Sequence, residues 1–90
     1  MDDTYFPEIS EDDYESFRAI MNHELMPTYR EWLEYIAKRV AHFSKTRNII
    51  KVEVKPDDVS AYLRKSGHGA DLNSLYMVAE FLGKRRKGYI

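Results

Sequence analysis

The stretch Ile50-Lys51-Val52-Glu53-Val54-Lys55-Pro56-Asp57-Asp58 decides the fold of this chain. Apolar and charged side chains alternate from residue 50 to residue 55, which predicts a strand with one buried and one solvated face. A strand cannot satisfy its own backbone donors and acceptors, so it needs a partner strand. Because only one strand is evident in the 90 residues, we expect the same strand of a second copy to be the partner, and the protein to be a homodimer.

Two helices should follow this strand. Pro56 suits the first position of a short helix, and Gly67 suits its left-handed C-cap. Asp71 or Asn73 then caps a last helix, which ends in a run of four basic residues before Gly88. The apolar face of that helix consists of Leu72, Leu75, Val78, Ala79 and Leu82.

Two more helices should precede the strand. Ser10, followed by three acids, predicts the start of a first helix that ends near Leu25, ahead of Pro27. Thr28 and Glu31 form a capping box, which predicts a second helix to about Lys45. Its apolar stripe consists of Trp32, Leu33, Ile36, Val40 and Phe43.

The chain length and these elements indicate one mainly α domain, with about four helices and one short strand that pairs across a dimer. Within residues 1–90 we expect a loose lead at 1–9, two helices at 10–47 and a strand-helix-helix unit at 48–88.

Composition narrows the class of protein. The chain has no cysteine, which removes disulfides and thiolate chemistry. The acidic start shows no signal peptide, and the longest uncharged run, Leu72 to Ala79, is far too short to span a membrane. We therefore expect a cytoplasmic protein without a membrane partner. The net charge of −1 is divided between a half of −4 (residues 1–48) and a half of +3 (residues 49–90).

No pattern in the sequence points to catalysis. His23, His42 and His68 do not stand at the spacings of a helical metal site, and no phosphate-binding or dinucleotide-binding glycine motif is present. We therefore predict no catalytic residue, no metal, no cofactor and no enzymatic activity.

Two charged segments are candidates for binding a partner. Asp12 and Asp13 belong to an acidic lead, and Lys84, Arg85, Arg86 and Lys87 form a basic end. Favourable interaction with the helix dipole explains both segments without a partner. An acidic surface could instead dock on a basic protein, and the basic end suits phosphate contact.

Residues 50–87 resemble the ribbon-helix-helix family of DNA-binding repressors and antitoxins. The alternating strand, the proline-led helix and the glycine turn before a capped helix carry this resemblance. It implies that two strands pair across a dimer and lie in the major groove. Lys51, Glu53 and Lys55 would then face DNA, while backbone donors near Asn73 and Ser74 would hold a phosphate.

The segment 26–33, together with Lys55-Pro56-Asp57-Asp58, also resembles small bacterial or phage proteins that have no assigned function. We therefore expect a small non-catalytic interaction or regulatory protein that forms a homodimer and has an unidentified protein partner. The alternative is a ribbon-helix-helix transcriptional regulator or antitoxin that binds DNA.

Overall fold

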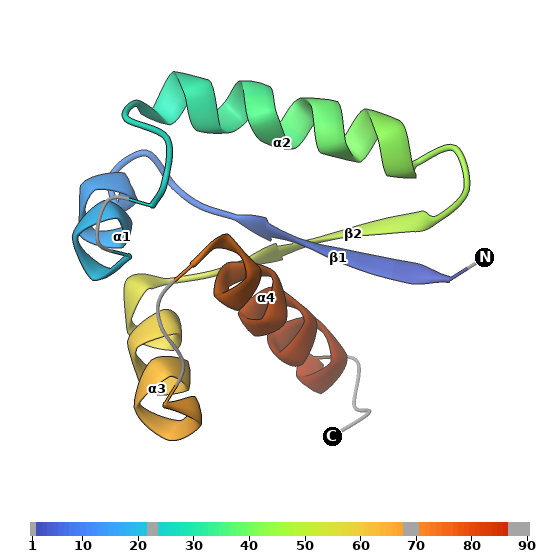
Figure 1. Cartoon of the computed structure of the whole chain (residues 1–90). Coiled ribbons are helices and arrows are strands. Elements are labelled where there is room, and N and C mark those ends of the chain that lie inside the picture. Colours follow the sequence, from blue (N-terminus) through green and yellow to red (C-terminus); the bar gives the residue numbers. More distant parts are fainter. Residues whose placement is uncertain (1, 22–23, 68–70, 87–90) are drawn as a thin grey trace.

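The computed structural model describes residues 2–21, 24–67 and 71–86. Its elements are β1 (Asp3–Glu8), α1 (Tyr14–Ile20), α2 (Tyr29–Phe43), β2 (Asn48–Glu53), α3 (Pro56–Ser66) and α4 (Leu72–Arg86). The two strands form a sheet that lies between α2 on one side and α3 with α4 on the other (Figure 1). The expected mainly α fold with four helices is confirmed over the described residues.

The N-terminal lead was predicted to be loose, and this prediction was wrong. Residues Asp3–Glu8 form β1, which pairs in parallel with β2 and places Tyr5 opposite Ile50 and Pro7 opposite Val52. The premise that β2 has no partner within the chain was therefore also wrong. A parallel pair leaves no hairpin signature in the sequence, because its strands are joined by a long crossover rather than a tight turn.

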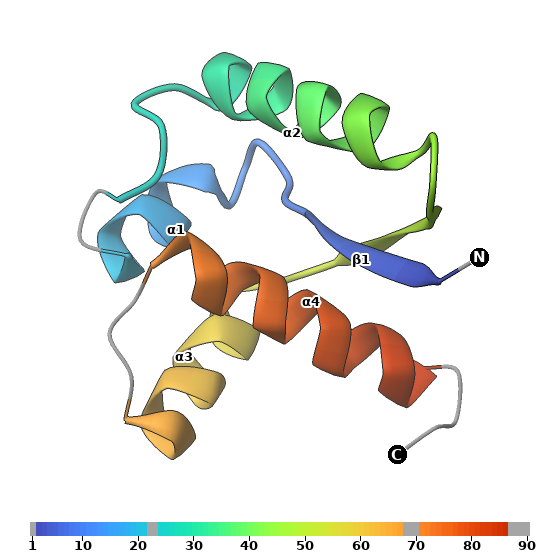
Figure 2. The ribbon, with the colours of Figure 1, turned by 45° about the vertical axis from the view of Figure 1, so that its right-hand side comes forward.

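The alternation predicted for β2 is confirmed. Val52 and Val54 are 2% and 1% exposed and belong to the core, whereas Lys51, Glu53 and Lys55 are exposed. The apolar side of the strand thus faces α4, which covers both strands over that face (Figures 1 and 2).

Helix α4 provides much of the core on this side. Its residues Leu75, Val78 and Ala79 are buried, as is Gly83. A Cβ atom at Gly83 would collide with the ring of Tyr5 and come within 3.0 Å of Val52 Cγ2. Glycine at this position therefore lets α4 approach the sheet closely.

Helix α1 is shorter than predicted. Ser10 Oγ accepts the N–H of Asp13 at 3.3 Å, so Ser10 caps a turn, and the helix itself begins at Tyr14. It ends at Ile20 rather than near Leu25. The hydroxyl of Tyr14 donates to the carbonyl of Met26 at 2.7 Å, a contact that requires the chain to reverse between these residues.

The other predicted helix ends are confirmed or nearly so. Thr28 Oγ1 accepts the N–H of Glu31 at 3.2 Å, and α2 ends at Phe43. Pro56 is the first residue of α3, and Gly67 has the left-handed φ of 70°. At the start of α4, Asp71 Oδ1 accepts the N–H of Ser74 at 2.8 Å, so Asp71 is the capping residue.

Candidate functional site at the open edge of β2

One edge of β2 has no partner strand in the described chain. The N–H of Asn48 donates to Asp2 and the N–H of Val54 donates to Glu8, so the even-numbered residues of β2 point their backbone groups at β1. The odd-numbered residues therefore point theirs away from β1. Within the described residues, neither the N–H nor the C=O of Ile49 and Lys51 has a hydrogen-bond partner.

The outer edge of β1 differs from that of β2. The same register places the backbone nitrogen of Pro7 on the outside of the sheet, where it carries no hydrogen. Proline on an edge strand blocks the addition of a further strand. The sheet can therefore be extended at β2 but not past Pro7 on β1.

A groove of about 370 Å³ lies between α2 and the sheet, over the side chains of the odd-numbered β2 residues. Trp32, Leu33 and Ile36 of α2 form its apolar wall. Lys51, Glu53 and Lys55 line it from the β2 side, together with residues 6–10. The groove and the outer edge of β2 thus share Lys51 and Glu53, because side chains and backbone groups alternate with the same period along a strand.

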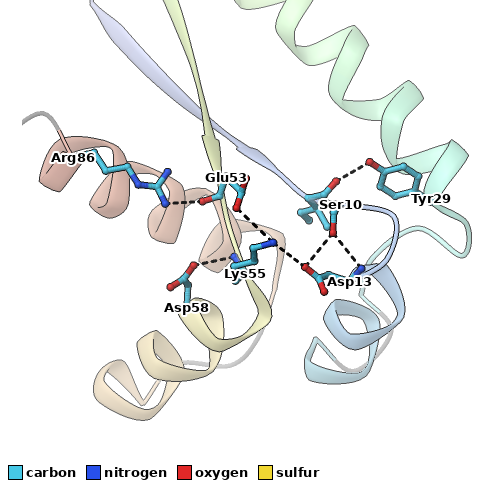
Figure 3. A network of polar contacts seen from close by, with 8 residues as sticks. Ser10, Asp13, Tyr29, Glu53, Lys55, Asp58 and Arg86 are labelled. Atoms are coloured by element: carbon cyan, nitrogen blue, oxygen red, sulfur yellow. Dashed lines mark hydrogen bonds and ion pairs between the residues drawn. The ribbon is translucent and has the colours of Figure 1, made fainter.

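Several of the predicted charged residues meet at one end of this groove (Figure 3). Lys55 Nζ lies 3.5 Å from Glu53 Oε1 and 3.5 Å from Asp13 Oδ2, joining β2 to the turn before α1. The Glu53 carboxylate, with Asp13 as the second cause, raises the pKa of Lys55 above its usual value. Arg86 Nη2 donates to the carbonyl of Glu53 at 3.1 Å, and so occupies the open edge at that residue.

The apolar stripe of helix α2 is incompletely buried. Trp32 is 1% exposed, but Leu33 is 48% exposed, and Ile36, Val40 and Phe43 are only half-buried. An amphipathic helix gains its stability by burying its apolar stripe. The stripe of α2 therefore retains apolar surface that a further element could cover.

The remaining predicted site residues lie apart from this groove. Asn73 is exposed and Ser74 is buried at the start of α4, where the N–H of Ser74 is already bonded to Asp71. Lys84 pairs with Glu80 at 2.8 Å, and that bond raises the pKa of Lys84. Asp12 is exposed in the turn before α1, and Lys87 lies outside the described residues.

The described residues contain no cluster of three or more histidine, aspartate or glutamate side chains that could hold a metal ion. His42 is exposed on α2, with its ring 4.9 Å from that of Phe43, while His23 and His68 lie outside the described residues. Likewise, no helix in the described part of the chain is long and apolar enough to cross a membrane.

The arrangement offers a place for an added strand. A free strand edge offers main-chain hydrogen bonds, and an adjacent groove between a strand and a helix holds side chains of the added strand. The sequence indicated Lys51, Glu53 and Lys55 and a strand that pairs with a second copy, but not β1, nor Pro7, which closes the opposite edge. The run Thr4-Tyr5-Phe6, three residues with high strand propensity, was the available signal for β1.

Comparison with known proteins adds no assignment. A scan against protein-family models, a search of curated proteins and a search of solved structures each found no match for this chain.

Proposed function

We propose that this chain is a non-catalytic interaction or regulatory protein that works as a homodimer, in which β2 of one copy pairs with β2 of the other. The observation that carries this proposal is the open edge at Ile49 and Lys51, whose backbone groups have no partner in the described chain. A two-stranded sheet is marginal on its own, and pairing would extend it to four strands.

An antiparallel pairing of two β2 strands about a two-fold axis at Ile50 fits the backbone groups of Ile49 and Lys51 that point to the open edge. Ile49 then lies opposite the partner's Lys51, and each such pair exchanges two main-chain hydrogen bonds, which gives four bonds in all. Arg47 lies opposite the partner's Glu53, so opposite charges face each other across the strands. Arg86 already occupies the carbonyl of Glu53, which limits the ladder to the central residues.

The apolar surface of α2 supports the same arrangement. Four hydrogen bonds at about 0.5–1.5 kcal/mol each contribute only a few kcal/mol, which the loss of translational and rotational freedom would largely offset. A strand added at β2 would also cover the groove lined by Leu33 and Ile36. The burial of that apolar surface supplies the additional stabilisation that a dimer requires.

The test compares Lys51→Pro with Lys51→Thr. Both variants lose the charge, but only proline removes the N–H that points to the open edge, and an edge position tolerates proline in the monomer. Sedimentation equilibrium should give twice the 10.7 kDa chain mass for the wild type and for Lys51→Thr. Lys51→Pro should give a folded monomer, as judged by circular dichroism.

A wild-type protein that stays monomeric at about 1 mM, where association would contribute less than ~4 kcal/mol, would contradict the proposal. A Lys51→Pro variant that remains dimeric would contradict it equally, since the dimer would then use another surface.

DNA binding in the ribbon-helix-helix manner is the second candidate. The exposure of Lys51, Glu53 and Lys55 favours it, because that family reads DNA through alternate residues of its paired strands. Helix α2 lies over the same face of the sheet, which counts against a fit in the major groove. The ion pairs of Lys55 with Glu53 and Asp13 reduce the charge available for phosphate. Binding to a duplex that weakens steeply between 50 and 200 mM salt, and is lost in Lys51→Glu with Lys55→Glu, would support this candidate.

A further inference from the structure

A second groove, of about 500 Å³, lies between α3 and α4, on the opposite side of the sheet from α2. Met77 and Phe81 of α4 border it and are 44% and 50% exposed, and Val78 and Leu82 contribute further apolar surface. The two helices diverge along this groove (Figure 2). The only large apolar side chain in the described residues with comparable exposure is Leu33, on α2.

The charges around this groove are mainly positive. Lys65 lines it from the last turn of α3, and Arg85 lines it from the last turn of α4. One acid also lines the groove: Asp58, at the start of α3, accepts the N–H of Lys55 at 2.9 Å through Oδ2, so two cations stand against one carboxylate. The groove therefore combines an apolar floor with cations on both walls.

We propose that this groove binds an amphipathic helix of a partner protein whose apolar anchors are flanked by glutamate or aspartate. Met77 and Phe81 are four residues apart and so lie on one face of α4. They form an apolar wall against which an incoming helix can pack its own anchors at one-turn spacing. Helix α4 has 15 residues, about 22 Å in length, which accommodates an incoming helix of several turns. Lys65 and Arg85 would meet the flanking carboxylates.

Neither α1 nor α2 of a second copy offers a helix of this kind. Helix α1, which follows the acidic lead, is held in the core by Tyr14 and Phe17, which are 2% and 0% exposed. The exposed face of α2 carries both acids and bases, including Glu34 and Lys38. The positive charge of Lys65 and Arg85 instead favours an acidic helix of a different protein as the occupant, and this proposal is independent of pairing at β2.

The test uses two 16-residue helical peptides with the same four leucine anchors at i, i+4, i+7 and i+11. One peptide has glutamate at the flanking positions and the other has lysine. Titration into ¹⁵N-labelled protein should show binding of the glutamate peptide at least ~10-fold tighter than of the lysine peptide, with the amides of α3 and α4 perturbed.

Phe81→Glu should weaken the glutamate peptide at least ~10-fold, whereas Ala37→Glu, which adds the same charge on exposed α2, should not. Lys65→Glu with Arg85→Glu should reverse the preference between the two peptides. Binding of neither peptide at about 1 mM, or equal binding of both, would overturn the proposal. Conversion of a wild-type dimer into a monomer by Phe81→Glu would also overturn it, since the groove would then hold a second copy.

Discussion

Helices α2 and α4, which lie on opposite sides of the sheet, differ in two respects. The sequence predicts α2 more clearly than α4, but α4 is the more deeply buried of the two. Helix α2 has a side-chain cap at Thr28 and a wide apolar stripe, yet Trp32 is its only buried residue. Helix α4 has a less marked stripe, yet its Leu75, Val78, Ala79 and Gly83 are buried, and the helix packs against both strands. Amphipathic character thus shows which surface a helix can bury, but not whether the chain itself supplies the partner.

The largest expected effect compares a leucine on each helix. Leu75 on α4 is 0% exposed, so Leu75→Ala should lower the free energy of unfolding by about 2–5 kcal/mol. Leu33 on α2 is 48% exposed in the single chain, so Leu33→Ala, compared in the monomeric Lys51→Pro background, should lower it by about 0.5 kcal/mol or less. Urea denaturation at one fixed protein concentration measures both. Equal losses of free energy in the two variants would contradict the conclusion that α4 is more deeply buried than α2.

A smaller effect tests the close approach of α4 to the sheet. Gly83→Ala should destabilise by about 1–3 kcal/mol, because the added Cβ collides with Tyr5 next to Val52. Alanine is otherwise better than glycine inside a helix by about 1 kcal/mol, so a stabilised variant would show that α4 does not approach this closely. The midpoint of urea denaturation should fall if the added Cβ collides with Tyr5, and it should rise if only the helix propensity of alanine acts.

The side-chain cap of α2 should also contribute to the free energy of unfolding, because the packing of that helix is incomplete. Thr28→Ala removes the acceptor for the N–H of Glu31 and should cost about 1 kcal/mol. Amide exchange should increase in the first turn of α2 and remain unchanged in α4. If both helices respond equally, α2 is packed more firmly than its exposure indicates.

The hydroxyls of Tyr35 and Tyr76, 2.9 Å apart, join α2 to α4 directly. Burial, followed by the bond with Tyr35, raises the pKa of Tyr76 above the usual 10.0. Folding therefore favours the neutral phenol, so the stability that it contributes is complete below about pH 10 and is lost as the pH rises further. Tyr76→Phe should cost about 0.5–1.5 kcal/mol at pH 7 and make the loss of stability above pH 10 less steep, as urea denaturation at several pH values would measure. An unchanged alkaline slope would mean that other groups, such as Tyr14, account for it.

Local chemistry could be predicted from the sequence, whereas long-range pairing could not. The caps at Thr28 and Asp71, the left-handed Gly67 and the alternation along β2 all depend on neighbouring residues. Strand β1 was missed because its partner is distant in the chain, and Gly83 because its role comes from a tertiary contact. The same distinction applies to the candidate site. Lys51, Glu53 and Lys55 could be predicted because they lie in the alternating strand, whereas the groove could not, because it also requires the distant elements α2 and β1.

Amide hydrogen exchange at Ile49 and Lys51 tests the central proposal, pairing at the open edge of β2, most directly. Ile50 and Val52, whose N–H groups point at β1, provide the internal reference on the same strand. We expect protection at Ile49 and Lys51 that rises with protein concentration toward that of the reference amides. Rapid exchange of these two amides at every concentration, beside protected Ile50 and Val52, would contradict the proposal.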